Sequence, residues 1–255
     1  MLPETMPVCP VRGSVIYPTM VMPIDAGRPI SIRAIDEALA RDRVLLIVSQ
    51  RDKEVETPRP SDLFEVGTAC NILKMRKNPD GSVQVLVQAF ARVRVREWLD
   101  LGDHLEARGE VLADEPGEPI LVKALVREVK DKFQALLKEG KYLAPEVAQF
   151  ILNLEDPSQL ADYVAFHMDF RLEDKQKVLE TANVAERLRA VLVLLEAELA
   201  LIETQRRIQQ QVKEEIDRNQ REYFLREQMK AIQRELHGEE GEQEVEEFRR
   251  KLEAL

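Results

Sequence analysis

The chain has 255 residues, 44% of them hydrophobic and 33% charged, and its formal net charge is -10. That length suffices for two domains of ordinary size, while the acidic balance argues against a nucleic-acid-binding protein, which usually presents a basic face. The longest apolar runs, such as 44–48 and 191–195, are far shorter than the roughly 18 residues that a membrane-spanning helix needs.

The N-terminus lacks the basic segment and apolar run of a secretory signal peptide. We therefore expect a soluble, cytoplasmic protein with no membrane partner. Cys9 and Cys70 could form a disulfide, but a reducing compartment favours two free thiols. Both lie in apolar, strand-like segments, so the sequence predicts that both are buried.

Residues 1–115 are predicted to form an antiparallel, β-rich lobe. The continuous apolar run 44–48 indicates a strand that is buried on both faces. Residues 66–75 have a β-rich composition, and Asn78-Pro-Asp-Gly81 places its residues as a type I turn favours. Strands this close together favour a meander that closes into a small barrel or sandwich.

Alternating side chains predict the remaining strands of this lobe, at 83–89 and 105–111. One helix, at about 29–41, is expected to interrupt the strands because its apolar residues share one face. Three basic residues alternate with valines and are expected to form the polar face of a strand: Arg92, Arg94 and Arg96.

The segment from Val15 to Ile24 is apolar and contains two prolines and two methionines. One interpretation is a strand at the edge of the sheet, with side chains that face the core. The other is an exposed apolar surface that binds a partner, because methionine side chains adapt to varied partners. In the second case the candidate binding residues are Tyr17, Pro18, Met20, Val21, Met22 and Pro23.

The run from Asp114 to Pro119 combines proline, glycine and charge, which marks the end of the first lobe. Residues 116–202 are predicted to form a bundle of helices. The first helix follows apolar spacing from Leu121 to Leu136, and Gly140 is placed to end it.

Two further helix starts carry capping signals. Pro145 fits the first position of one helix, and the sequence Asp156-Pro-Ser-Gln159 fits an N-cap followed by proline at the first helical position. A short helix is predicted at about 173–181.

A much longer helix is predicted from Val184 to His237, where the sequence has neither proline nor glycine. Asn183 and Glu186 form a capping box at its start. At 1.5 Å per residue it would span roughly 80 Å. The apolar stripe from Leu188 to Ile202 is expected to pack on the preceding helices, and residues 203–238 form an extended arm.

Near the end of this arm apolar residues return at spacings that suit a seam with a second helix. These candidate assembly residues are Tyr223, Phe224, Leu225, Met229, Ile232 and Leu236. The pair His237-Gly238 is expected to end the helix. The glutamate-rich residues 239–255 are expected to be an acidic linker or the first turns of another helix.

Sequence signals of catalysis are missing from these residues. A phosphate-binding loop needs Gly-Lys-Ser/Thr after an earlier glycine, but the single Gly140-Lys141 pair is followed by Tyr142. The three histidines, His104, His167 and His237, are too far apart for metal-ligand spacing. We expect no catalytic, cofactor or metal site here, and we expect the histidines to be structural.

Several segments resemble the N-terminal region of bacterial Lon proteases. The strongest is Asn219–Leu236, which is similar to the segment before the ATPase module of that family. Leu172–Thr181 and Ala185–Leu188 also match, in the same order, and Pro10–Pro23 followed by Gly27-Arg28 resembles the family's first strand and loop. Departures are Gly13, where the family often has aspartate, and Thr19, where it often has glycine.

This resemblance implies an α+β fold with a PUA-like β-rich lobe, a helical lobe and a long connecting helix. It also implies that the AAA+ ATPase, which uses ATP and magnesium, and the Ser-Lys protease belong to parts of the family's proteins outside this chain. The implied role is non-catalytic recognition of unfolded, damaged or degron-bearing proteins. The segment 15–24 would be the substrate-binding site.

Two other functions stay open from the sequence. The chain could be chiefly an assembly module, in which residues 223–236 pair with neighbouring subunits of the hexamer that the resemblance implies. It could also be a small-molecule-binding β-domain, but Trp98 is the single tryptophan and no aromatic cluster supports that reading.

Overall fold

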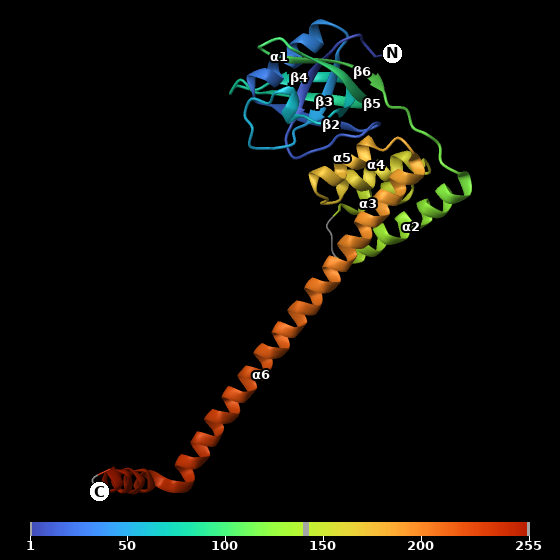
Figure 1. Ribbon diagram of the computed structural model, residues 1–255. Coiled ribbons are helices and arrows are strands. Elements are labelled where there is room, and N and C mark those ends of the chain that lie inside the picture. The colour runs from blue at the N-terminus through green and yellow to red at the C-terminus, as the bar shows by residue number, and fades with distance from the viewer. Residues whose placement is uncertain (1, 140–142, 254–255) are drawn as a thin grey trace. The chain divides into compact units, whose positions relative to one another are not determined.

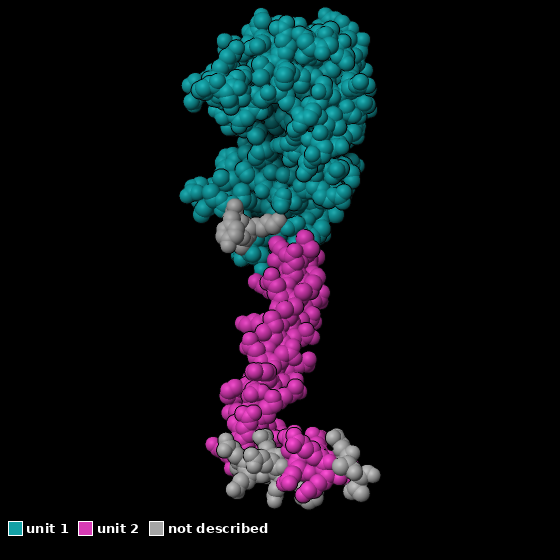
Figure 2. Space-filling model, turned by 90° about the vertical axis from the view of Figure 1, so that its left-hand side faces the viewer, with its two compact units in different colours: residues 1–199 teal, residues 200–255 magenta. Residues whose placement is uncertain are grey.

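The computed structural model describes residues 2–139 and 143–253, apart from the side chains of residues 236–245, 248 and 253. It divides into two compact units, Met1–Leu199 and Ala200–Leu255, which Figure 2 colours separately. Unit 1 contains a β-rich lobe followed by helices (Figure 1), which confirms the predicted α+β class. Among the helices of the described residues, none combines the length and apolar character that crossing a bilayer needs.

The β-rich lobe is a six-stranded sheet in the order β2-β5-β4-β3-β1-β6, and β5 also pairs with β6. This extra pairing closes five strands into a barrel and leaves β2 attached to β5 alone. The strand bounds are β1 Met6–Val11, β2 Val21–Ala26, β3 Val44–Ser49, β4 Val66–Lys77, β5 Val83–Asp100 and β6 Leu105–Val111.

The strand β3 is buried along its whole length, as its continuous apolar sequence predicts. Successive side chains of a strand point to opposite faces. Leu45 and Ile47 therefore join the core cluster that lies under helix α1 (Pro29–Ala40). Leu46 and Val48 join a second cluster on the other face of the sheet.

One strand pair differs from the antiparallel prediction. The strands β1 and β3 run parallel, with Val8 opposite Leu46 and Val11 opposite Ser49. The chain passes through β2 and α1 between these two strands, and this long connection lets β3 return in the same direction as β1.

Two backbone positions show where the barrel constrains its sequence. A Cβ atom at Gly67 would lie 2.5 Å from the carbonyl oxygen of Ile47, so the close approach of β3 and β4 leaves no space for a side chain. Thr19 has a φ of 70°, a region that β-branched residues rarely adopt. Glycine, the residue that the resemblance favours at this position, would adopt this conformation without strain.

Within the described residues, five helices follow the barrel, and two of their starts confirm the predicted capping signals. Pro145 lies in the first turn of α3, and the Asp156 side chain accepts a hydrogen bond from the Gln159 backbone at 3.0 Å at the start of α4. Gly140 lies outside the described residues. The bounds of these helices are α2 Pro119–Lys138, α3 Pro145–Leu152, α4 Pro157–His167, α5 Leu172–Glu180 and α6 Val184–Glu253.

Helix α6 begins where the sequence predicts and continues beyond the predicted end. The Asn183 side chain accepts hydrogen bonds from the backbone of Ala185 and Glu186, both at 3.1 Å, which is the N-cap half of the predicted capping box. The pair His237-Gly238 does not end the helix, because the backbone is helical to Glu253. A glycine inside a helix costs only about 1 kcal/mol, and the flanking glutamates are good helix formers.

Candidate functional site

The segment from Val15 to Ile24 divides into a buried half and an exposed half. Tyr17, Pro18 and Met20 are buried, and the Tyr17 hydroxyl donates a hydrogen bond to the Lys175 carbonyl oxygen at 2.8 Å. These three candidates are therefore buried in the core, and Tyr17 also contacts helix α5. They agree with the core-facing part of the first interpretation, but they lie in the loop that precedes β2 and not in the strand itself.

The other three candidates lie on β2, where the alternation of side chains decides their exposure. Val21 is 54% exposed, Pro23 is also exposed, and Met22 between them is half-buried. The antiparallel register places Val21 opposite Gln88 and Pro23 opposite Leu86 on β5. Because paired residues share a face, the exposed side chains of β2 continue onto β5.

A group of apolar side chains therefore lies on the outer face of three neighbouring strands, interspersed with the polar side chains of Asn71, Lys74 and Gln88. We call it the outer-face patch, and its members are Val21 and Pro23 on β2, Leu86 and Phe90 on β5, and Leu73 on β4. Leu73 is 47% exposed and Phe90 is 37% exposed. Both lie at irregularities in the pairing of β4 with β5, where the local bend of the strand turns a side chain outward.

Three members of this patch, Leu73, Leu86 and Phe90, are not predicted as binding residues from the sequence. A signal for two of them was present in β5, where Leu86 and Phe90 occupy positions that alternate with the inward-facing valines. Nothing in the sequence around Leu73 indicates the β-bulge that exposes it.

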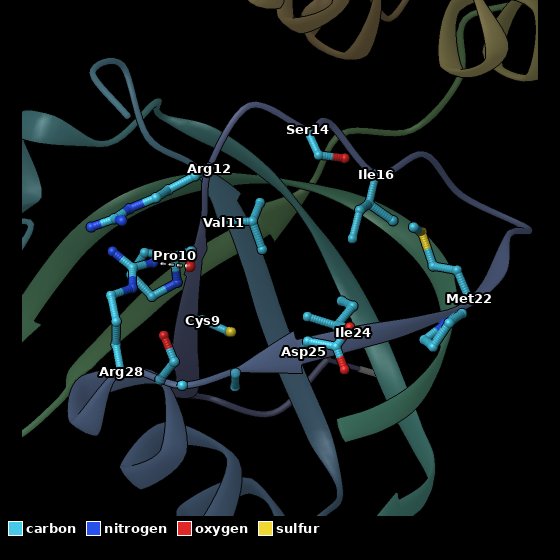
Figure 3. Close-up of a pocket in the computed structure, with 14 residues that line it drawn as sticks. Cys9, Pro10, Val11, Arg12, Ser14, Ile16, Met22, Ile24, Asp25 and Arg28 are labelled. Atoms are coloured by element: carbon cyan, nitrogen blue, oxygen red, sulfur yellow. Dashed lines mark hydrogen bonds between the residues drawn. The ribbon is translucent and has the colours of Figure 1, made fainter. Parts of the chain in front are cut away.

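A cavity of about 310 Å³ lies beside β2, and residues of β1 and β2 contribute to its lining. Its apolar lining includes Cys9, Ile16 and Met22, and Arg12 and Arg28 lie at one side (Figure 3). Burial raises the pKa of the Cys9 thiol to about 11, so this sulfur stays protonated at neutral pH and is a poor nucleophile. The cavity therefore offers apolar contact, the positive charges of Arg12 and Arg28 and the negative charge of Asp25, with no activated group.

A cluster of buried charges joins the β-rich lobe to the helices, and it overturns one sequence expectation. Arg92 is not part of a solvated strand face: it is 4% exposed and its guanidinium donates to the Asp162 carboxylate of α4 at 2.6 Å. Arg187 of α6 is fully buried and donates to Asp114 at 2.7 Å and to Ser158 at 2.7 Å. The sequence gives no partner for Arg92, because its partners come from distant segments.

The carboxylates of this cluster have opposite pKa shifts. Burial raises the pKa of Asp162 to about 6, although Arg92 and Arg187 act to lower it. Asp114 is only partly buried, and hydrogen bonds from Arg187 and Ser158 outweigh the effect of that burial, so the pKa of Asp114 is lowered. The arrangement is that of a structural junction, since its charges are paired with one another.

His104 is buried beside two carboxylates, with Nδ1 at 2.6 Å from Asp103 and Nε2 at 3.3 Å from Glu106. These contacts fit the structural role that we expect for it. Within the described residues, no group of three histidine, cysteine or acidic side chains is arranged to hold a metal ion.

The candidate assembly residues of α6 are exposed in unit 2. The five whose side chains are described, Tyr223, Phe224, Leu225, Met229 and Ile232, have exposures between 52% and 69%. The side chain of Leu236 lies outside the described part of the chain. Nearer the start of α6, Leu188, Val191 and Leu195 are fully buried, as the dense apolar stripe predicts.

The chain matches known sequences along almost its whole length. The profile of the family described as ATP-dependent protease La (LON) substrate-binding domain matches residues 5–197. A Lon protease of Escherichia coli (strain K12) is 40% identical over 249 residues, and one of Brevibacillus choshinensis is 38% identical over 249 residues. Both alignments cover 97% of this chain and 32% of the relative, so the chain spans about a third of the length of these relatives.

Solved structures agree with these matches. The N-terminal domain of a Mycobacterium avium complex Lon protease superposes with a TM-score of 0.63 and 26% identity, covering 76% of this chain and 98% of that structure. A Lon N-terminal domain protein from Xanthomonas campestris, at 12% identity, a TM-score of 0.51, and coverage of 74% of this chain and 97% of that one, shares the fold. The resemblance found in the sequence is thereby confirmed, and the chain belongs to the family of the ATP-dependent protease La (LON) substrate-binding domain.

Proposed function

We propose that this chain is a non-catalytic substrate-recognition region of a Lon-like ATP-dependent protease. It captures unfolded, damaged or degron-bearing proteins, which the ATPase and protease domains of the full-length enzyme then degrade. ATP and magnesium act in those other domains, and no cofactor is assigned to the residues of this chain.

The observation that carries this proposal is the outer-face patch in a chain of the substrate-binding family. Unfolded proteins have exposed apolar side chains in common, so a receptor for them needs an accessible apolar surface of its own. The patch is small, and one copy binds weakly. Several copies in an assembled enzyme raise the effective concentration of the second and later contacts.

The candidate site changes accordingly. Val21 and Pro23 remain, with Met22 beside them, and Leu73, Leu86 and Phe90 extend the surface across the sheet. Tyr17, Pro18 and Met20 are buried, so we remove them from the candidate site.

A charge placed in the patch tests the proposal. The variant Val21→Asp is compared with Val111→Asp, because Val111 is 51% exposed on β6 and lies outside the patch. Full burial of a valine is worth about 1.5–3 kcal/mol, so covering the exposed half of Val21 contributes about 1 kcal/mol, or about fivefold in affinity. Fluorescence anisotropy with a labelled, permanently unfolded protein measures the dissociation constant.

We expect the Val21→Asp variant to bind at least fivefold more weakly and the Val111→Asp variant to bind like the wild type. Circular dichroism of both variants shows whether the fold is retained. Equal binding by folded Val21→Asp and wild-type protein would remove the outer-face patch from the site.

A second function, self-association through α6, is favoured by the exposed apolar residues between Tyr223 and Ile232. Sedimentation velocity of residues 1–255 tests it with two matched variants, Ile232→Asp and Ile216→Asp, since these side chains are 54% and 50% exposed on the same helix. If this segment drives assembly, Ile232→Asp shifts the chain toward the monomer and Ile216→Asp does not. A chain that is monomeric at all concentrations contradicts this function.

A further inference from the structure

The strand β2 has a hydrogen-bonding partner on only one side. It pairs with β5 from Val21 to Ala26, and no other strand of the described residues pairs with it. A free strand edge presents backbone donors and acceptors that can pair with another chain. The edge of β2 is thus an exception in a barrel whose other five strands are paired on both sides.

The register identifies which backbone groups face the free side. The Ala89 backbone donates to the Met20 carbonyl oxygen at 2.8 Å, and bonded and non-bonded pairs alternate along an antiparallel ladder. Val21, Pro23 and Asp25 therefore turn their backbone groups away from β5. Proline has no N–H to donate, and its position on the unpaired side agrees with its usual confinement to sheet edges.

The free edge of β2 borders the cavity of about 310 Å³. Every residue from Met22 to Gly27 lines this cavity. Side chains of successive strand residues point to opposite faces. Since the residues from Met22 to Gly27 all line the cavity whichever face their side chains are on, the edge of β2 itself forms part of the cavity wall. Figure 3 shows the side chains of Val11, Ile16 and Met22 directed toward the same space.

A half-buried positive charge lies at the end of this edge. Arg28 follows β2, and its guanidinium donates to the Pro10 carbonyl oxygen at 2.6 Å and to the Gln50 side chain. Within the described residues, no carboxylate forms an ion pair with Arg28, whereas the neighbouring Arg12 pairs with Glu56 at 3.2 Å. Burial and the charge of Arg12 lower the pKa of Arg28 and outweigh the charge of Glu56, which acts to raise it. A carboxylate within ion-pair distance of this guanidinium would therefore be favourable.

We propose that the free edge of β2 accepts an extended segment of polypeptide as an added strand, with an apolar side chain in the cavity and a side-chain carboxylate beside Arg28. The inference rests on the proposed function, since it names how the unfolded substrate binds. Main-chain pairing suits a receptor of many sequences, because every polypeptide supplies the same amides, while alternate side chains give selectivity. The cavity has the volume of a small ligand site, which fits one or two side chains.

Backbone-methylated peptides test the added strand without altering the protein. The probe is a labelled nine-residue peptide with blocked ends, alternating valine and threonine, and one glutamate near an end. Successive amides of an added strand point alternately toward β2 and toward solvent. N-methylation of one alternate set is therefore expected to weaken binding to the chain at least tenfold, and methylation of the other set less than threefold.

A second comparison tests whether the glutamate carboxylate of the peptide lies beside Arg28. Replacing the peptide's glutamate with glutamine is expected to weaken binding to the wild-type chain three- to tenfold and to leave binding to an Arg28→Met variant unchanged. An isomeric peptide that carries its only charge on a free C-terminus is expected to bind no better than the glutamine peptide. If it binds as well as the glutamate peptide, the assignment to a side-chain carboxylate is wrong.

Two variants of Asp25 test strand addition by changing the protein instead of the peptide. The Asp25 carboxylate accepts a hydrogen bond from Gln84 at 2.8 Å. Asp25→Pro removes the carboxylate and the outward N–H, whereas Asp25→Ala removes the carboxylate alone. Only the proline variant is expected to lose peptide affinity, by at least fivefold.

The results of these experiments distinguish strand addition at β2 from the proposed substrate-recognition function on which it rests. Equal losses from both methylation sets, or no peptide binding by a chain that still binds unfolded protein through Val21, would overturn strand addition and leave the proposed function standing. A chain that binds neither probe contradicts both.

Discussion

Replacing Arg92 with methionine tests whether the buried charge cluster holds the β-rich lobe on the helices. The Arg92 guanidinium contacts the Asp162 carboxylate at 2.6 Å and donates to the Leu179 carbonyl oxygen at 3.2 Å. Methionine fills a similar volume but removes the cation nearest to Asp162. The next cation, Arg187, is 3.9 Å from the same carboxylate, so Asp162 would stay buried with one distant partner.

The expected loss follows from this geometry. Removing one partner of a buried ion pair costs about 3–5 kcal/mol, and we expect about 3 kcal/mol because Arg187 remains. Arg96 provides the matched control on the same strand, since its pair with Glu110 is exposed. Solvent screens such a pair, so Arg96→Met should leave the free energy of unfolding nearly unchanged.

Urea unfolding measures both variants. The fluorescence of Trp98 reports on β5 and far-ultraviolet circular dichroism reports on the helices. With a denaturant dependence of about 2 kcal/mol per molar, the midpoint of Arg92→Met should fall by about 1.5 M. Equal midpoints for the Arg92→Met and Arg96→Met variants would refute the role of the cluster in stability.

The loss in Arg92→Met should also depend on pH. Burial already raises the pKa of Asp162 to about 6, and removing Arg92 raises it further. A group whose pKa is raised by folding stabilises the protein at low pH, and that stabilisation is lost as pH rises through the folded pKa. The variant should therefore lose least at pH 5 and most at pH 8. A loss that is the same at both values would show that the charge of Asp162 is not involved.

Three further predictions concern backbone strain and thiol chemistry. Gly67→Ala should lower the free energy of unfolding by about 1–3 kcal/mol, because its Cβ would overlap a neighbouring strand. The control Gly27→Ala should be nearly neutral, since nothing lies within 4 Å of its Cβ. The urea midpoints of the two variants measure the difference. Thr19→Gly should raise the free energy of unfolding by about 0.5–1 kcal/mol, since the left-handed conformation strains threonine. A melting temperature below that of the wild type would contradict this. Burial raises the pKa of Cys9 and of Cys70, so both thiols should react with Ellman's reagent at pH 8 only after unfolding. Rapid labelling of the folded chain would refute their burial.

The strands and helices were largely predictable because their signals are local. The apolar run of β3, the turn at Asn78–Gly81 and the caps at Asp156 and Asn183 each depend on neighbouring residues, and the structure places all of them as predicted. The end of α6 was not predictable from Gly238, because one glycine is a weak stop signal among strong helix formers.

The candidate site was only half predictable. The segment 15–24 was recognised as unusual, but sequence alone could not divide it, because the division depends on which side of β2 faces the barrel. Once β2 pairs with β5, Val21 and Pro23 must face outward with Leu86, and the half-buried Met22 lies between them. The buried Tyr17 is explained by a helix more than 150 positions further along the chain, as its bond to Lys175 shows.

The sequence by itself therefore determined the family, the α+β class and the position of most elements, because family motifs, caps and periodicity are properties of neighbouring residues. The tertiary structure decided which apolar side chains stay exposed, which strand edge stays unpaired and which charges are buried. Arg92 illustrates the difference: it alternates with valines like Arg94 and Arg96, yet its environment is set by Asp162, a residue that only folding brings within 2.6 Å.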